Sequence, residues 1–258
     1  MTYTLEVCVD SVASALAAKR GGADRLELCA DLIIGGTTPS LALVRQVKAE
    51  TDLPVRALLR PRFGDFCYDR YELAQMAETA AALVQAGADG IVTGVLTPEG
   101  ELDVDALRPI YAAARAAAKA AGRPVVCTLH RAFDVCKDPF AALEAANALN
   151  LGTILTSGQA ASAPAGASLL RRLVEAAGPD LEILVGAGVT PANLPALAAE
   201  TGAHAFHMSG QQVYDIIFAH DNVANFMHIV GGVCGTAFGY VYAMLPRKRR
   251  RPAARKKR

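Results

Sequence analysis

Short apolar runs alternate with longer alanine-rich stretches eight times before residue 210, and this alternation constrains the fold more than any other feature of the chain. The apolar runs have the composition and length of strands, and the stretches between them have the apolar spacing of helices. We expect strands at 3–9, 24–29, 54–60, 90–96, 124–130, 152–156, 181–185 and 204–208. Repeated strand–helix units with short connections predict parallel strands. Eight such units favour an α/β fold of the closed (β/α)8 TIM-barrel type over an open doubly wound sheet.

The predicted helices end and begin with recurring residues. Glycine follows them at Gly21-Gly22, Gly87 and Gly202, where it can supply at little cost the left-handed conformation that ends a helix. The pairs Asp138-Pro139 and Thr190-Pro191 predict helix starts, with Asp or Thr as the N-cap and proline in the first turn. The predicted helices span 11–20, 40–50, 70–85, 104–121, 139–149, 166–177 and 191–200.

The barrel interior is predicted to be unusually polar. Alternate residues of a strand face opposite sides, so each strand supplies one set to the helix layer and one to the interior. The interior sets contain charged, imidazole and thiol groups, namely Glu6, Cys8, Arg25, Glu27, Cys29, Arg56, Arg60 and His130. Unpaired buried charge costs several kcal/mol per ion. We therefore expect either an ion-pair network joining Glu6 and Glu27 to Arg25 and Arg60, or a functional site at the C-terminal ends of the strands, where barrels build theirs.

Residues after the later strands are candidates for binding an anion. Glycine-rich turns at this end of a barrel often present backbone N–H groups to phosphate or carboxylate, although a Gly-Xaa-Gly pattern alone is a weak signal. The candidate ligand-binding residues are Arg25, Arg60, Arg131, Ser157, Gly158, Gly186, Gly188, His207 and Ser209.

Two cysteines suggest a metal site. Cys8 and Cys29 are 21 residues apart, which is one strand–helix unit, so they are expected on neighbouring strands at similar height. Two thiolates are too few for a typical zinc site but suit Cu(I). The alternative interpretation is that both are small buried core residues, as free cysteine often is.

A second hypothesis is enzymatic. His130 and Asp134 at the end of the fifth strand, together with Glu6 and Glu27, could transfer protons in a metal-independent enzyme acting on a small anionic metabolite, including a phosphorylated one. The sequence contains no Walker loop, HExxH or GxSxG motif, so nucleotide hydrolysis, zincin and α/β-hydrolase activities lack support.

Charge and cysteine content limit the partners and the compartment. Nine of the 26 basic residues lie after residue 246, which leaves 17 basic against 25 acidic residues before it, a net charge of −8. Such a domain is a poor nucleic-acid binder, which needs a basic face. Six cysteines without a signal peptide before Met1 predict a reducing, cytoplasmic protein.

Seven ordered motifs between residues 5 and 210 resemble the CutC family of copper homeostasis proteins. They are EVCVDS at 6–11, GGADRLELC at 21–29, GGTTPS at 35–40, RPRFGDF at 60–66, HRAFD at 130–134, LTSG at 155–158 and FH at 206–207. The resemblance implies a cytoplasmic TIM barrel, often a homodimer, that takes part in copper tolerance. It also implies Cu(I) binding through the thiols of Cys8 and Cys29.

The sequence departs from this family after Gly210. Residues 222–245 contain no charged side chain, carry a tandem GxxxG pattern and weakly resemble the last transmembrane helix of rhomboid-like proteins. We divide the chain into a barrel at 1–215, a hydrophobic segment at 216–245 and a disordered basic tail at 246–258. The hydrophobic segment has three interpretations: a membrane anchor through 222–245, an unusual eighth barrel helix, or a fused or frameshifted reading frame.

Overall fold

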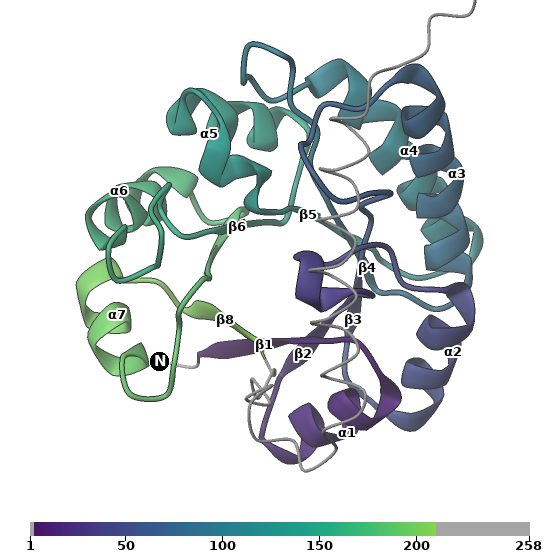
Figure 1. Cartoon of the computed structure of the whole chain (residues 1–258), viewed down its shortest axis with the longest axis horizontal. Helices are drawn as coiled ribbons and strands as arrows, with labels where there is room; N and C mark the ends of the chain where they lie inside the picture. Colours follow the sequence, from purple (N-terminus) through teal and green to yellow (C-terminus); the bar gives the residue numbers. More distant parts are fainter. Residues whose placement is uncertain (1–2, 210–258) are drawn as a thin grey trace, which may run out of the picture. The chain divides into compact units, whose positions relative to one another are not determined.

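The computed structural model describes residues 3–209, which form a closed barrel of eight parallel strands in the order β1 to β8 (Figure 1). The strands are β1 (Thr4–Val9), β2 (Arg25–Leu28), β3 (Val55–Leu58), β4 (Gly90–Thr93), β5 (Val126–Leu129), β6 (Thr153–Thr156), β7 (Glu182–Val185) and β8 (Ala205–Ser209). Strand β1 pairs with both β2 and β8, so the barrel closes on itself. The predicted TIM-barrel fold is confirmed, and each observed strand overlaps its expected range, although β3 ends two residues and β4 three residues earlier than expected.

In the described part of the chain, seven helices surround the strands on the outside of the barrel (Figure 1). They are α1 (Val12–Arg20), α2 (Leu41–Glu50), α3 (Arg70–Gln85), α4 (Val104–Ala120), α5 (Pro139–Ala148), α6 (Ala167–Ala177) and α7 (Leu194–Thr201), with two short 3-10 helices, η1 (Leu32–Ile34) and η2 (Arg131–Val135). Within residues 3–209, no helix is both long and apolar enough to cross a membrane. The expected boundaries at 215 and 245, and the segment 222–245, lie outside the described residues.

Most helix ends follow the expected chemistry. Asp138 accepts hydrogen bonds from the first backbone N–H groups of α5, and Gly202 ends α7 with a φ of 71°. The expected start of α7 at Pro191 is wrong by three residues. The side chain of Asn193 accepts from the backbone N–H of Thr190, and its amide donates to the carbonyl of Gly188, which holds a turn in place of the first helical residues.

The main hydrophobic core lies between strands and helices, and the interior of the barrel has a mixed lining. Helix-facing residues such as Leu26, Leu28 and Ile91 are fully buried in this core. Inside the barrel, polar groups share the space with two small apolar clusters. One contains Cys8, Cys29, Leu58 and Val92, and the other contains Leu155, Leu184 and Ala205. The predicted polar interior is therefore present, with apolar side chains beside it.

Candidate functional site

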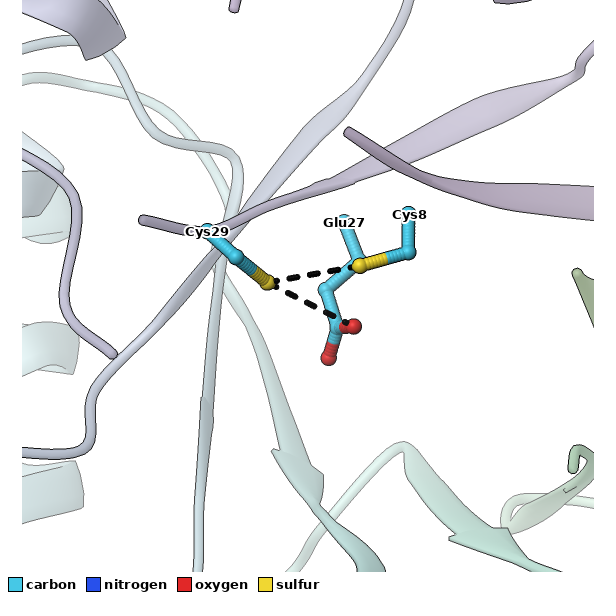
Figure 2. Close-up of side chains that lie close together, drawn as sticks. All are labelled: Cys8, Glu27 and Cys29. Carbon is cyan, nitrogen blue, oxygen red and sulfur yellow. Dashed lines mark hydrogen bonds between the residues drawn. The ribbon is translucent and has the colours of Figure 1, made fainter. Parts of the chain in front are cut away.

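The structure brings Cys8 and Cys29 together inside the barrel. Their Sγ atoms are 3.5 Å apart and both residues are buried. The strand register causes this, since Cys8 lies opposite Glu27 and the chain places Cys29 two residues further along, on the same face. Figure 2 shows the carboxylate of Glu27 beside the two sulfurs, and Cys29 Sγ lies 3.8 Å from Glu27 Oε2. The three potential ligand atoms all lie within 4.8 Å of one another.

The pKa values of the two thiols are shifted in opposite directions. The hydrogen bond from Cys29 lowers the pKa of Cys8 to about 5, and a hydrogen bond from His207 helps to overcome burial, which raises it. The same contact with Cys8, together with burial, raises the pKa of Cys29 well above its ordinary value. At neutral pH the pair therefore holds one thiolate and one thiol. A thiolate is the form of cysteine that binds metal.

His207 connects the Cys8, Glu27 and Cys29 cluster to the carboxylate of Glu6, which lies closer to the N-terminal ends of the strands. Its Nδ1 atom is 2.9 Å from Glu6 Oε1, and its Nε2 atom is 3.6 Å from Glu27 Oε2. Against burial, which lowers it, the charge of Glu27 and hydrogen bonds to Cys8 and Glu6 raise the pKa of His207 well above its ordinary value. A histidine beside a metal site commonly uses its second nitrogen in this way, because the carboxylate fixes the orientation of the ring.

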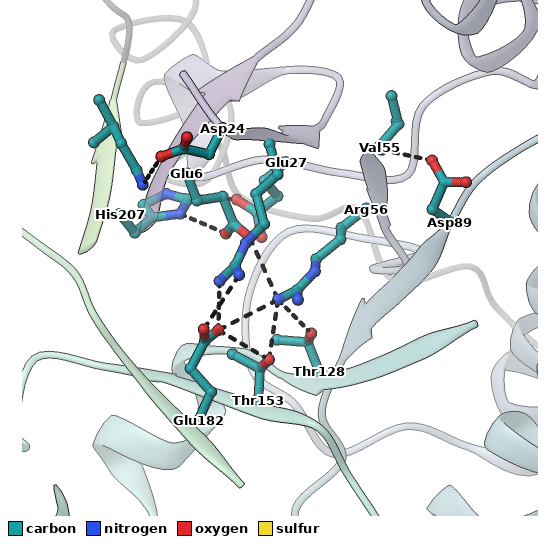
Figure 3. Close-up of polar contacts among 12 residues, drawn as sticks. Glu6, Asp24, Glu27, Val55, Arg56, Asp89, Thr128, Thr153, Glu182 and His207 are labelled. Carbon is teal, nitrogen blue, oxygen red and sulfur yellow. Dashed lines mark hydrogen bonds and ion pairs between the residues drawn. The ribbon is translucent and has the colours of Figure 1, made fainter. Parts of the chain in front are cut away.

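An ion-pair network lies inside the barrel, toward the N-terminal ends of the strands (Figure 3). Arg25 Nε donates to Glu6 Oε2 over 2.6 Å, and Arg25 Nη2 donates to Glu182 Oε1 over 2.6 Å. The Arg56 guanidinium approaches Glu6 to 3.5 Å and donates to the Thr153 hydroxyl over 3.0 Å. Against burial, which raises it, His207 and the two arginines lower the pKa of Glu6 to about 2.

This network corrects two expectations. Arg25 and Glu182 each open their strand, so the network lies toward the N-terminal ends of the strands rather than at the C-terminal mouth. Among the described residues no carboxylate pairs with Arg60, whose expected partners were Glu6 and Glu27, and Arg56 takes that place. Glu182 was missed, although it lies two residues before the interior residue Leu184 and so shares its face.

Arg60 instead binds backbone carbonyls at the barrel mouth. Its Nη1 atom donates to Gly35 and Gly36, each over 3.2 Å, and its Nη2 atom donates to Gly64 over 2.8 Å. Its guanidinium also lies over the ring of Phe66, with Cζ 5.1 Å from the centroid. Arg60 thus joins the loop after β2 to the loop after β3.

His130 lies at the end of β5 in apolar surroundings. Its ring packs 4.7 Å from that of Phe66, and its Nδ1 atom accepts a hydrogen bond from the backbone N–H of Ala132. Burial, assisted by the positive charge of Arg60, lowers the pKa of His130 to about 3. The imidazole is therefore neutral at pH 7. This pKa is far from the neutral range that favours proton transfer.

Asp134 organises the loop after β6. It accepts hydrogen bonds from Arg131 Nε, from the Thr156 hydroxyl and from the backbone N–H of Ser157, at 2.5 to 3.0 Å. The backbone N–H of Gly158 donates to the Thr156 hydroxyl.

The other residues expected to bind an anion lie on neighbouring strands. The backbone N–H of Gly186 donates to the carbonyl of Thr156, so it is already used within the protein. Gly188 has a φ of 71° and follows β7, while Ser209 lies in register with Cys8 at the end of β8.

The remaining described cysteines lie away from the Cys8 and Cys29 pair. Cys127 is buried in the core between strands and helices. Cys67 is exposed in the loop after β3, and Cys136 is buried at the end of η2. All five described cysteines are free thiols.

Comparison with known proteins gives one consistent result. The model of the CutC family matches residues 3–212. A CutC family protein of Chromobacterium violaceum is 44% identical over 211 residues, which cover 82% of each chain. The human copper homeostasis protein cutC homolog is 41% identical over 83% of this chain and 75% of its own length. The crystal structure of CutC from Streptococcus agalactiae is similar with a TM-score of 0.74 and 28% identity, over 81% of this chain and 99% of that one.

Proposed function

The chain belongs to the CutC family, and we propose that it acts in copper homeostasis by binding Cu(I) through the thiolates of Cys8 and Cys29 in the cytoplasm. The observation that carries this proposal is the 3.5 Å separation of two buried sulfur atoms from neighbouring strands. Two sulfurs at this distance can both reach one ion with small side-chain rotations. The human and mouse relatives are named copper homeostasis protein cutC homologs, which agrees with this assignment.

The donor set favours Cu(I) over other metals. Soft thiolate ligands select Cu(I), whereas a structural zinc site requires four ligands of the Cys or His type. The Cys8, Glu27 and Cys29 cluster offers two sulfurs and one carboxylate, and His207 lies next to it. Two sulfurs supply the soft ligands, and the hard carboxylate balances charge more readily than it binds a soft ion. The two apolar neighbours Leu58 and Val92 keep the sulfurs away from water.

The direct test is a Cu(I) titration of the reduced, full-length protein against a chromogenic Cu(I) chelator. We expect one equivalent to be bound, and we expect the Cys8→Ser, Cys29→Ser double variant to lose that binding. Cys127→Ser is the matched control, because it removes a buried thiol from the other side of β5 and should leave the affinity unchanged. Equal affinity in the double variant and the wild type would refute the proposal.

The cytoplasmic location and the homodimer are parts of the same proposal. Free thiols at all five described cysteines suit a reducing compartment, in which Cu(I) is the stable copper ion. Fractionation of cells that express the full chain tests the location.

The enzymatic alternative remains a prediction. It assigns proton transfer to His130 and Glu27, but these side chains have different surroundings. His130 packs on Phe66, whereas Glu27 contacts Cys29 and His207. Burial also raises the pKa of Glu27 well above its ordinary value.

A further inference from the structure

Three buried polar atoms without a hydrogen-bond partner belong to residues that follow the C-terminal ends of β3 and β5. They are Arg60 Nε, Tyr68 Oη and His130 Nε2. Within residues 3–209 no other buried side-chain nitrogen or oxygen lacks a partner. Buried polar groups are almost always hydrogen-bonded, so three exceptions in one region call for an explanation such as a ligand.

Arg60 and His130 both contact the ring of Phe66, while Tyr68 packs under the guanidinium of Arg62 and also senses the charge of Arg60. The guanidinium of Arg60 lies over the ring of Phe66, and the ring of His130 packs against the same ring. Burial raises the pKa of Tyr68 to about 12, and the nearby charge of Arg60 opposes this rise. We call Arg60, Phe66, Tyr68 and His130 the Phe66 cluster.

The cluster contains a buried positive charge that no carboxylate balances. Arg60 is 9% exposed, its guanidinium donates to three glycine carbonyls and lies close enough to the Tyr68 hydroxyl to affect its pKa, and no carboxylate among residues 3–209 pairs with it. The other two buried arginines, Arg25 and Arg56, both pair with glutamates. Arginine stays protonated in proteins, and a buried cation without a counter-charge is costly. Arg60 therefore needs an anion that the described residues do not supply.

All three partnerless atoms can donate a hydrogen bond. Because Nδ1 of His130 accepts from the N–H of Ala132, the ring proton lies on Nε2. Arg60 Nε–H is always a donor, and the Tyr68 hydroxyl can donate. Three donors and one positive charge in water-poor surroundings are complementary to a group with several acceptor oxygens and a negative charge.

We propose that the Phe66 cluster binds an oxyanion, the carboxylate or phosphate group of a small ligand, which accepts hydrogen bonds from Arg60 Nε, His130 Nε2 and the Tyr68 hydroxyl. The site goes beyond Cu(I) binding and does not depend on it, because the cluster shares no residue with Cys8, Glu27 and Cys29. Of the residues first expected to bind an anion, only Arg60 belongs to it. Arg131 donates to Asp134, and the backbone N–H of Gly186 is used within the sheet.

The test measures binding of two probes, inorganic phosphate and acetate, to the reduced, metal-free, full-length protein by isothermal titration calorimetry. We expect saturable binding of at least one probe. Phosphate alone identifies a phosphorylated ligand, and acetate alone identifies a carboxylate ligand. Tyr68→Phe and His130→Asn should each weaken binding by about five- to tenfold, since each removes one hydrogen bond to the anion. Failure of both probes to bind, or wild-type affinity in both variants, would overturn the proposal.

Two control variants separate this site from its surroundings. Tyr71→Phe removes a hydroxyl from an exposed tyrosine on α3, and we expect no change in anion affinity. The Cys8→Ser, Cys29→Ser double variant should bind the anion as the wild type does, so that failure of the copper proposal and failure of this one can be distinguished. A change in the His130 Nε2–H nuclear magnetic resonance signal on addition of the probe gives a readout that does not depend on affinity. An unchanged signal at a saturating probe concentration would place the anion elsewhere and contradict the proposal.

Discussion

The neutral state of His130 predicts a specific loss of stability in mild acid. Burial lowers its pKa from 6.5 to about 3 in the folded protein, whereas the unfolded chain binds the proton at the ordinary value. Between these two pH values the unfolded state holds more protons than the folded state, so the free energy of unfolding falls as the pH falls. This contribution is complete above pH 6.5 and is lost progressively toward pH 3.

The magnitude follows from the two pKa values. Between pH 7 and pH 5 the folded His130 stays neutral while the unfolded one becomes almost fully protonated. Linkage then removes about 2 kcal/mol of unfolding free energy over this interval. His207 contributes with the opposite sign, because its raised pKa makes the folded state hold the additional proton. Because the pKa values of Cys8 and Glu27 are also shifted, the total pH dependence of the wild type mixes the contributions of both histidines with those of these two groups.

The His130→Asn variant isolates the contribution of His130 to the pH dependence of stability. Asparagine can keep an acceptor for the N–H of Ala132 but does not titrate. We expect the stability difference between wild type and variant, measured by urea unfolding, to shrink by about 2 kcal/mol from pH 7 to pH 5. A difference that is the same at both pH values, or a His130 ring resonance that titrates between them, would refute the assignment of a buried, neutral imidazole.

Three further predictions concern the ion-pair network, the thiol pair and the assembly. Glu182→Gln should lower the unfolding free energy by about 1–3 kcal/mol, because it removes a negative charge that pairs with the buried arginines. Asp52→Asn, which removes an exposed ion pair with Lys19, should change it by less than about 1 kcal/mol. Equal urea midpoints for the two variants would contradict this. Gly36→Ala should weaken Cu(I) binding, since Gly36 has a φ of 85° and an added Cβ would lie 2.9 Å from Leu58 and 3.6 Å from Cys29 Sγ. Gly22→Ala has a similar φ of 87° without any neighbour within 4 Å and should bind Cu(I) normally, so equal affinities in a chelator competition would rule the effect out. Light scattering during size-exclusion chromatography should give twice the chain mass for a homodimer, and a monomer mass would exclude it.

Strand periodicity predicted most of the interior, and its failures have a common cause. Alternation in β1 and β2 correctly placed Glu6, Cys8 and Glu27 on one face, because the face of a strand residue depends only on its position within the strand. The alternation of faces cannot decide whether Arg56 or Arg60 pairs with the glutamates, because both point to the same face and differ only in height along the strand. The stagger between neighbouring strands makes that choice, and it places Arg56 opposite Glu27.

The alternation of strand residues also could not predict the Phe66 cluster. Phe66 and Tyr68 lie in the loop between β3 and α3, where no repeating pattern marks which side chains turn inward. Their contacts join segments far apart in the sequence, since the Phe66 carbonyl accepts from the N–H of Leu96 and the Phe66 ring packs against Arg60 and His130. Sequence reasoning identified His130 and Arg60 as candidates but could not find the aromatic side chains that join them.

One Cu(I) ion is predicted to bind between Cys8 and Cys29. X-ray absorption spectroscopy of the reduced, full-length protein with one equivalent of Cu(I) tests it most directly, because it identifies the ligand atoms rather than the affinity. We predict two sulfur ligands in the wild type and in Cys127→Ser, and the loss of this signature in the Cys8→Ser, Cys29→Ser double variant. A spectrum without sulfur ligands in the wild type, or an unchanged two-sulfur spectrum in the double variant, would contradict the account.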